Sequence, residues 1–141
     1  MLDVAISITA QAFEGRFDKG GKPYVLHCLH VMNAVSHYND DDLSCAAVMH
    51  DLVEDTPWTL DELAKVGFSA RVITTLALLT HVENVTYDDY IKAIATNEDA
   101  RRIKLADLRH NSDILRMKGL RKKDFDRMEK YHRSFVYLSG V

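Results

Sequence analysis

The sequence predicts an all-α protein, a single-domain helical bundle. Apolar residues recur at three- and four-residue intervals through most of the chain, and no stretch alternates between apolar and polar residues as a half-buried strand does. With 141 residues, of which 47% are hydrophobic and 28% charged, the chain has the length and composition of one ordinary globular domain. We therefore expect residues 1–141 to form one domain in which helices pack around a shared core.

Glycine and proline residues divide the first half of the chain into helices. Gly15 and Pro23 bound a loop, and Pro57 follows directly on an apolar helical pattern that it cannot continue. An acidic turn over residues 39–42 supplies an N-cap for the helix that follows it. The expected helices cover residues 2–12, 24–38 and 45–56.

Capping residues mark the helices of the second half. Thr59 and Glu62 are spaced as a capping box, Gly67 ends that short helix, and Ser69 can cap the next one. The long helices further on are expected to bury Ile114 and Phe125, respectively, because both lie on apolar stripes. The expected helices cover residues 59–67, 69–79, 87–95, 98–117 and 122–138.

The helix over residues 45–56 carries an unusual cluster of polar residues. On a continuous helix His50 stacks with Glu54, and Asp51 stacks with Asp55, beside the face that should be buried. Carboxylates that leave water repel one another and need a cation or hydrogen bonds to compensate them. A bound metal ion is the simplest compensation; the alternative is an acidic helix end exposed to solvent before Pro57.

Further metal ligands are present near the inward faces of other helices. His27 lies beside the apolar stripe of residues 24–38, and Asp107 continues the inward stripe of residues 98–117. A lone histidine at such a position is more often a hydrogen-bonded core residue, and an aspartate there also has a structural explanation through Lys104 or Arg109. Together with His50 and Asp51, however, these residues form a mixed N/O ligand set. Such a set suits manganese, iron or zinc better than magnesium, and four protein ligands leave positions open for water and substrate.

The charge of the chain limits its partners. A net charge of −3 and a pI near 6.1 give no general attraction to nucleic acid or to an anionic membrane. No apolar run approaches the roughly 20 residues that span a bilayer, and the two cysteines indicate a reduced, cytoplasmic setting. Nothing in the sequence indicates an oligomeric state. A small anionic substrate would need local positive charge, for which Lys19 and Lys104 are candidates.

The candidate ligands and the residues one turn beyond them indicate hydrolysis of a phosphate ester or anhydride. A metal ion lowers the pKa of a bound water towards neutrality and so creates a nucleophile. Glu54 and Asp55 lie close enough to orient that water or accept its proton, and we predict that they act as the acid/base residues.

At these residues the chain resembles the HD-domain metal-dependent phosphohydrolases, which are all-α. His27, His50-Asp51 and Asp107 match the H…HD…D pattern of that family. More narrowly, the chain resembles the hydrolase domain of RelA/SpoT proteins and the stand-alone small alarmone hydrolases. The matching segments are KPYVLH (22–27), AAVMHDLVEDT (46–56), TLDEL (59–63) and RIKLADLRHN (102–111).

The resemblance implies a role for each matched residue. It implies a manganese ion bound by His27, His50, Asp51 and Asp107. It implies that Glu54 and Asp55 activate or orient the water, that Lys19 and Asn111 contact the nucleotide, and that Lys104 lies next to the site. The implied reaction removes the 3′-pyrophosphate from ppGpp or pppGpp to give GDP or GTP.

The chain departs from the family pattern at three positions, Phe13, Asp18 and His81. Asp18 stands where the family commonly has an arginine that is expected to help hold the guanine. This departure concerns recognition of the base and leaves the metal chemistry unchanged. Two alternatives to alarmone hydrolysis therefore stay open: a phosphohydrolase of the same type that acts on another nucleotide, and a non-catalytic module that binds a nucleotide on this scaffold.

Overall fold

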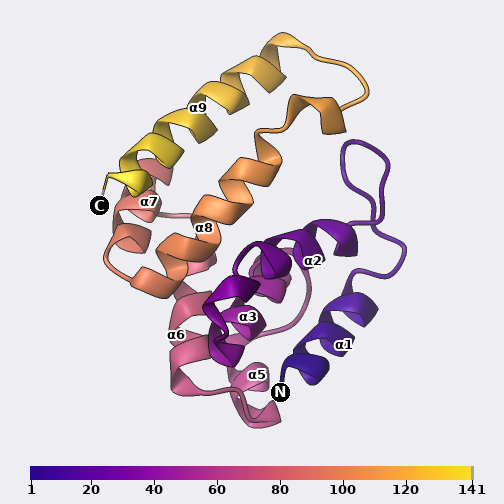
Figure 1. The fold of residues 1–141 in the computed structure, drawn as a ribbon, viewed down its shortest axis with the longest axis vertical. Coiled ribbons are helices and arrows are strands. Elements are labelled where there is room, and N and C mark those ends of the chain that lie inside the picture. Colours follow the sequence, from indigo (N-terminus) through magenta and orange to yellow (C-terminus); the bar gives the residue numbers. More distant parts are fainter. Residues whose placement is uncertain (141) are drawn as a thin grey trace.

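The all-α prediction is confirmed. The computed structural model describes residues 1–140, and these contain helices and no strand (Figure 1). One isolated antiparallel bridge between Phe17 and Pro23 closes the loop after the first helix. The helices are α1 (Leu2–Ala12), α2 (Val25–Ala34), α3 (Asp41–Val48), α4 (Leu52–Asp55), α5 (Leu60–Val66), α6 (Ala70–Leu79), α7 (Tyr87–Ala95), α8 (Glu98–Asn111) and α9 (Lys122–Ser139), with short 3₁₀ turns η1 (Ser36–Tyr38) and η2 (Ile114–Arg116).

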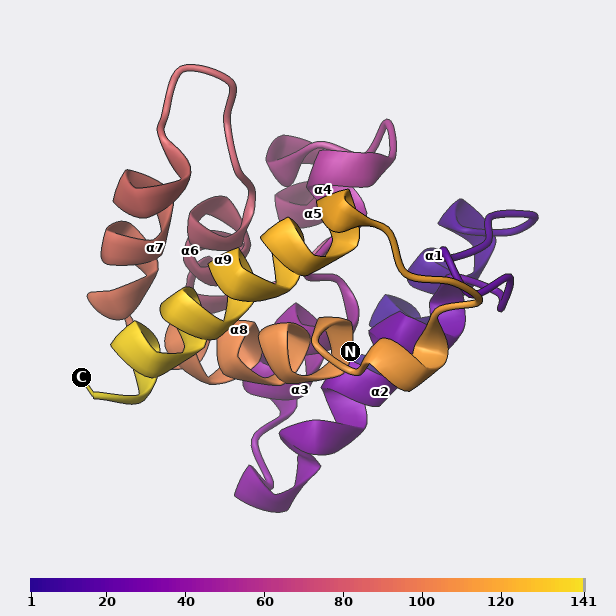
Figure 2. The same ribbon diagram turned by 90° about the horizontal axis from the view of Figure 1, so that it is seen from above.

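Helix α3 lies at the centre of the bundle. All of its residues from Leu43 to Val48 are buried, and α1, α2, α6 and α8 pack around it. Helix α8 contacts α2 and α3 on one side and α9 on the other, so that α9 forms an outer layer over α8 (Figures 1 and 2). No helix within residues 1–140 has both the length and the apolar character needed to cross a bilayer.

Most predicted helix starts are confirmed by the capping contacts. Asp40 accepts a hydrogen bond from the Leu43 amide at the start of α3, and Thr59 and Glu62 form the reciprocal capping box of α5. Gly67 ends α5 with a φ of 118°, a backbone conformation that residues with a Cβ atom rarely adopt.

Two predictions about the second half are wrong. The helix expected over residues 98–117 ends at Asn111, because the Arg116 guanidinium donates to the His110 carbonyl (2.8 Å) and turns the chain into η2. Ile114 is consequently 43% exposed, and Phe125 of α9 is 55% exposed although its stripe was expected to be buried.

An ion-pair network ties three helices together away from the cluster of ligands. Arg71 of α6 donates to both carboxylate oxygens of Asp40, at the N-terminus of α3 (2.6 and 3.1 Å), and to both of Asp99, in the first turn of α8 (2.7 and 3.0 Å). The hydrogen bonds from Arg71 lower the pKa of Asp40 below its usual value. The network is partly exposed, so solvent screens part of its contribution.

We predict that Arg71→Met lowers the free energy of unfolding at pH 7 by about 1 kcal/mol. The folded-state pKa of Asp40 is depressed, so its contribution is present above the unfolded value and is lost as the pH falls below roughly 4. Urea unfolding at pH 7 and pH 3 measures both values, and the difference between wild type and variant should shrink at pH 3. Arg133→Met, which removes one exposed pairing with Glu129, is the control and should change stability by less than about 0.5 kcal/mol at both pH values. A pH-independent loss in Arg71→Met would mean that the side chain acts through packing.

Candidate metal centre

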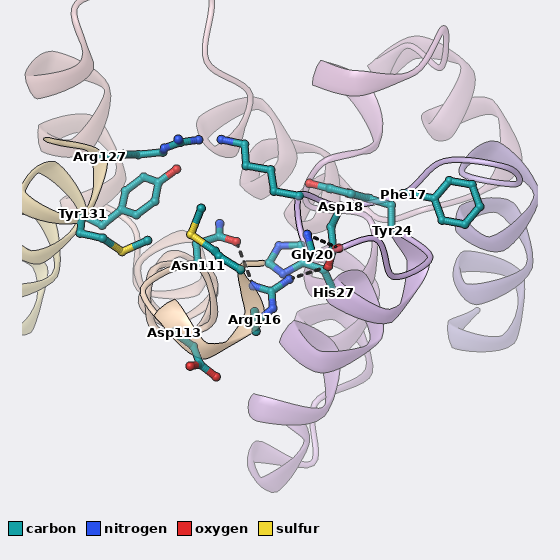
Figure 3. A pocket seen from close by; sticks show the side chains of 13 residues that line it. Phe17, Asp18, Gly20, Tyr24, His27, Asn111, Asp113, Arg116, Arg127 and Tyr131 are labelled. Atoms are coloured by element: carbon teal, nitrogen blue, oxygen red, sulfur yellow. Dashed lines mark hydrogen bonds and ion pairs between the residues drawn. The ribbon is translucent and has the colours of Figure 1, made fainter. Parts of the chain in front are cut away.

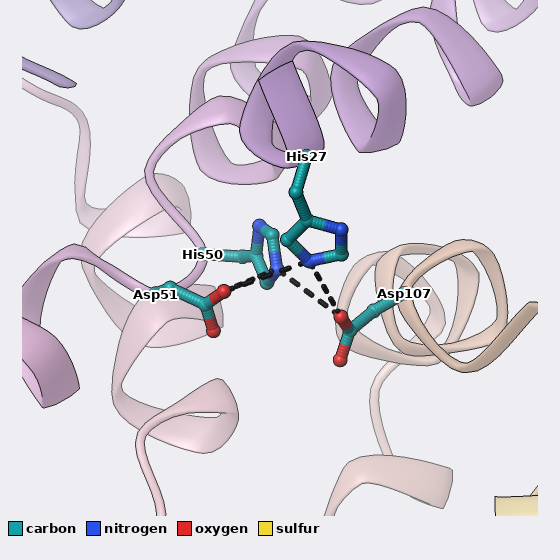
Figure 4. Close-up of side chains that lie close together, drawn as sticks. All are labelled: His27, His50, Asp51 and Asp107. Atoms are coloured by element: carbon teal, nitrogen blue, oxygen red, sulfur yellow. Dashed lines mark hydrogen bonds and ion pairs between the residues drawn. The ribbon is translucent and has the colours of Figure 1, made fainter. Parts of the chain in front are cut away.

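Four side chains that lie far apart in the sequence converge at one buried point. Each of His27, His50, Asp51 and Asp107 offers one ligand atom, and these atoms all lie within 4.8 Å of one another (Figure 4). Three of the residues are buried, and Asp51 is partly buried. The structure thus brings together all four residues that the sequence predicted as ligands.

Different elements supply these side chains. His27 lies in the first turn of α2, which starts directly after Pro23 and Tyr24. Asp107 lies one turn before the end of α8, which packs against α2. His50 and Asp51 come from the turn between α3 and α4.

The prediction of one continuous helix through His50 and Asp51 is wrong. In such a helix the Ala47 carbonyl would accept from the Asp51 amide. Here it accepts instead from the His50 amide (3.3 Å) and lies 2.8 Å from Nδ1 of the same residue, so α3 ends at Val48. The break aims His50 and Asp51 at the same point, while the bond from the Asp55 amide to the Asp51 carbonyl restores one helical turn in α4 (3.0 Å).

The distances between the ligand atoms fit a bound cation. Metal–ligand bonds of about 2.0–2.2 Å place neighbouring ligand atoms roughly 3.0 Å apart at a right angle and roughly 3.4 Å apart at the tetrahedral angle. The Asp107 Oδ1 atom lies 3.0 Å from Nε2 of His27 and 3.4 Å from Nε2 of His50. The corresponding distances from Asp51 Oδ2 are 3.6 and 3.0 Å.

His50 shows most directly that the cluster needs a cation. Its Nδ1 faces a carbonyl oxygen, which can only accept, so the ring proton of the neutral form is on Nδ1. Its Nε2 is buried and makes no hydrogen bond of acceptable geometry, although two carboxylate oxygens lie within 3.4 Å. Burial lowers the pKa of His50, but the charges of Asp51 and Asp107 outweigh it and raise the pKa well above its usual value. Nε2 therefore holds a proton unless a metal ion replaces it.

His110 provides the corresponding support for His27. The Nδ1 atoms of the two rings lie 2.7 Å apart, so one ring must donate and the other accept. Burial and the charge of Arg116 lower the pKa of His110 to about 4, which keeps this ring neutral and able to accept. When the His27 proton is on Nδ1 towards His110, the Nε2 lone pair is available to a metal ion; without an ion, Nε2 lies 3.0 Å from Oδ1 of Asp107, which can only accept.

The two carboxylates are held by their own partners. Asp107 accepts from the Lys104 ammonium (2.9 Å to Oδ2) and from the Asn111 amide (2.9 Å to Oδ1). Asp51 accepts from the Tyr24 hydroxyl (2.6 Å). Burial raises the pKa of Asp107, but the Lys104 charge and the neighbouring imidazoles lower it well below its usual range. Both carboxylates are consequently ionised and oriented before any ion binds.

The predicted acid/base residues lie beside the cluster. Glu54 accepts from the His81 amide (2.7 Å), which fixes its carboxylate. Burial, together with the charges of Asp51 and Glu54, raises the pKa of Asp55 to about 6. A carboxylate with such a pKa is a stronger base than an ordinary one and is still ionised at neutral pH.

A pocket adjoins the cluster on the side of His27. It has a volume of about 310 Å³, and His27 forms part of its wall. Figure 3 shows side chains that enter this pocket from the loop after α1, from the end of α8 and η2, and from α9. The polar residues of its wall are Asp18, Lys19, Tyr24, His27, Asn111, Asp113, Arg116, Arg127 and Tyr131.

The structure places the three predicted substrate-binding residues differently. Lys19 and Asn111 line the pocket, as expected for residues that meet a nucleotide. Lys104 does not line it, because its ammonium is bound to Asp107. A contact between Lys104 and substrate stays a prediction.

Several residues of the site had not been assigned a role from the sequence. Tyr24 lies one turn before His27, and His110 lies one turn after Asp107, so helical spacing was the available signal for both. Arg116 pairs with Asp18 (3.1 Å) across 98 positions in the sequence, and Arg127 comes from α9. Only the tertiary fold brings these two arginines to the pocket.

A helical bundle that gathers two histidines and two aspartates in this way is a metal-site scaffold. A family model described as HD domain matches residues 5–114, and the chain belongs to the HD-domain family.

The chain is also similar to named proteins. It is 32% identical over 120 residues to the guanosine-3′,5′-bis(diphosphate) 3′-pyrophosphohydrolase of Haemophilus influenzae. This alignment covers 77% of this chain and 18% of that protein. It is 35% identical over 106 residues to the protein of the same name from Aquifex aeolicus, over 69% of this chain and 15% of that protein. The chain thus spans less than a fifth of the length of these relatives.

A solved structure shares the fold. It superimposes with a TM-score of 0.78 over 97% of this chain and 84% of its own, at 22% identity. Its title describes a metazoan orthologue of SpoT that hydrolyses ppGpp and plays a role in starvation responses.

We predict that Mn²⁺ binds the metal-free protein and stabilises it. At a concentration 100 times the dissociation constant, a ligand of the native state adds about 2.7 kcal/mol, which for a domain of this size raises Tm by roughly 10 °C. Asp107→Asn should abolish this shift, because it removes one ligand charge. Differential scanning fluorimetry with and without Mn²⁺ measures the effect.

The matched control is Asp126→Asn, which removes an exposed carboxylate paired with Lys122. It should retain the full shift in Tm. Each variant is compared with its own metal-free form, because the loss of Asp107 also leaves Lys104 without its partner. A full shift in Asp107→Asn would contradict the proposed ligand set.

Proposed function

We propose that this chain is a manganese-dependent hydrolase that removes the 3′-pyrophosphate from guanosine tetra- and pentaphosphate, (p)ppGpp, giving GDP or GTP and pyrophosphate. The observation that carries the proposal is the convergence of the His27, His50, Asp51 and Asp107 ligand atoms beside a pocket that His27 helps to line. The two relatives described above are named for this reaction, and the chain matches them across most of its length.

The four ligands fit a divalent transition metal. Two imidazole nitrogens and two carboxylate oxygens form a set of intermediate softness, which accepts manganese, iron or zinc and disfavours magnesium. When bound, such an ion supplies Lewis-acid chemistry, because it polarises a phosphoryl oxygen and strengthens water as a nucleophile at neutral pH.

Glu54 and Asp55 handle the proton of the attacking water. The water oxygen attacks the phosphorus attached to the 3′ oxygen, the bond between that oxygen and phosphorus breaks, and pyrophosphate is released. Asp55, whose pKa is raised to about 6, accepts the water proton, and the proton is then available to the departing 3′ oxygen. Glu54, fixed by the His81 amide, orients the water.

The cations of the pocket bind the phosphates of the substrate. We assign Lys19 and Arg127 to charge-assisted contacts with phosphate oxygens, and Asn111 to a hydrogen bond that orients them. Asp18 cannot supply the positive charge that the arginine of the family pattern would offer to the base. Its carboxylate accepts from Arg116 (3.1 Å) and from the amides of Gly20 and Lys22 (both 2.9 Å).

A panel of substrates with Mn²⁺ tests the proposal. It contains ppGpp, the adenine counterpart of ppGpp and simple nucleotides, and the release of pyrophosphate and of orthophosphate is measured. We expect pyrophosphate and GDP from ppGpp, and no turnover by Asp107→Ala. Release of orthophosphate from another nucleotide, without turnover of ppGpp, would identify a different phosphohydrolase. Tight nucleotide binding without turnover under any metal would identify a non-catalytic module.

We predict that Glu54→Gln and Asp55→Asn each lower kcat by about 10²–10⁴-fold, because each removes a carboxylate that acts on the water. Neither residue belongs to the ligand cluster, so both variants should keep the rise in Tm with Mn²⁺. Steady-state kinetics and scanning fluorimetry on the same preparations separate the two effects. Glu129→Gln, on an exposed part of α9, serves as control and should leave kcat unchanged. A variant that loses kcat and the Mn²⁺ shift together would place its carboxylate among the ligands.

A further inference from the structure

A second, strongly basic depression adjoins the metal pocket. It has a volume of about 540 Å³ and lies where the segment between η2 and α9 passes the loop after α1. Figures 1 and 2 both show these two segments next to each other, although they are far apart in the sequence. Its charged residues are Lys19, Lys118, Arg121, Lys123, Asp124 and Arg127; we call this depression the basic groove.

The basic groove is continuous with the pocket at the metal centre. Lys19, Met117 and Arg127 line both of them, so the two depressions adjoin at these three residues. His27 lines the pocket and does not line the groove. The two together form one elongated site.

The charge of the groove is opposite to that of the chain as a whole. Five basic residues and one acidic residue line it, whereas the complete sequence carries a net charge of −3. The one acidic residue, Asp124, is already neutralised, because it accepts from the Arg127 guanidinium (2.7 Å) and from the Arg121 amide (2.9 Å). The groove therefore presents a concentrated positive field to any ligand.

The segment that carries Lys118 lies directly against the loop that carries Lys19. A Cβ atom on Gly21 would lie 2.8 Å from the Lys118 ammonium, which places that ammonium against the loop that carries Lys19. A Cβ atom on Gly20 would collide with the Arg116 carbonyl oxygen, so the two segments are in direct contact. The salt bridges of the described residues do not include Lys118, Arg121 or Lys123. An anion with several charges would reduce the electrostatic repulsion between these cations.

We infer that the basic groove binds the 5′ phosphate chain of the nucleotide whose 3′ phosphates lie at the metal centre. The inference rests on the proposed function and extends it, because it predicts a preference among substrates by the number of 5′ phosphates. Lys118, Arg121 and Lys123 are the residues that set this preference. The groove is a bounded depression on an acidic chain, which favours a short phosphate chain over a nucleic acid backbone.

Kinetics on a series of substrates test the inference. The substrates share one 3′-pyrophosphate and carry a 5′ hydroxyl, monophosphate, diphosphate or triphosphate. For the wild type we expect KM to fall about three- to tenfold with each added 5′ phosphate. This decrease in KM per phosphate, which we call the gain, should become smaller as the salt concentration rises. The triple variant Lys118→Gln, Arg121→Gln, Lys123→Gln should lose this gain and keep the kcat and KM of the 5′-hydroxyl substrate.

The control has the same change in net charge at exposed cations elsewhere. Lys65→Gln, Lys92→Gln, Arg133→Gln should retain the dependence on 5′ phosphates. An equal rise in KM for all four substrates, or an unchanged gain in the groove variant, would overturn the inference.

Binding of inorganic tripolyphosphate, measured by calorimetry, separates this inference from the proposed function. If no 3′-pyrophosphorylated nucleotide is hydrolysed, the proposed function fails. The groove is still supported when the wild type binds tripolyphosphate and the triple variant does not. It is overturned when the wild type fails to bind, or when an RNA oligonucleotide of equal phosphate concentration binds more tightly.

Discussion

The structure depends on one electrostatic constraint, the need for a cation among two imidazoles and two carboxylates. Two aspartate oxygens lie within 3.0–3.6 Å of the same pair of histidine nitrogens in a buried space. Without positive charge the lone pairs and the carboxylates repel, and burial increases the cost. A proton on His50 relieves part of this repulsion, while a divalent ion relieves all of it and uses every ligand atom. The fold keeps the carboxylates ionised by charges and donors outside the cluster, through Lys104 and Tyr24.

The ligands and the residues that hold them come from two different parts of the bundle. Helices α2 and α3 and the turn after α3 supply His27, His50 and Asp51, while α8 supplies Asp107 together with the groups that hold it, Lys104 and Asn111. Because α2 packs on α8, the ligands meet only when the core between these helices is formed. The cluster is therefore a consequence of the tertiary fold, and the same packing orients His27 through His110.

The sequence predicted most of the helices and singled out four residues that the fold brings together, whereas their role as metal ligands stays a prediction. The helix predictions failed where side chains override helical periodicity. Capping residues such as Thr59 are local signals, so the start of α5 was predictable. The end of α3 was not predictable, because the His50 imidazole is bound to the Ala47 carbonyl, which a continuous helix would use. No glycine or proline marks this break in the sequence. The end of α8 depends on Arg116, five residues beyond it in sequence, which also reaches Asp18 on a distant loop. Periodicity over residues 98–117 carries no information about such a contact.

Arg116 also links the two parts of the elongated site. One guanidinium nitrogen donates to the His110 carbonyl at the end of α8, and another pairs with Asp18 on the loop that precedes Lys19. The same residue thus fixes the end of the helix that carries Asp107 and the loop that lines both the pocket and the basic groove. Asp18 lines the pocket too, but its charge is compensated by this pairing with Arg116, so Lys19 is the free charge that the loop offers to a ligand. The departure from the family pattern at Asp18 is therefore accommodated without placing an uncompensated negative charge beside the phosphates.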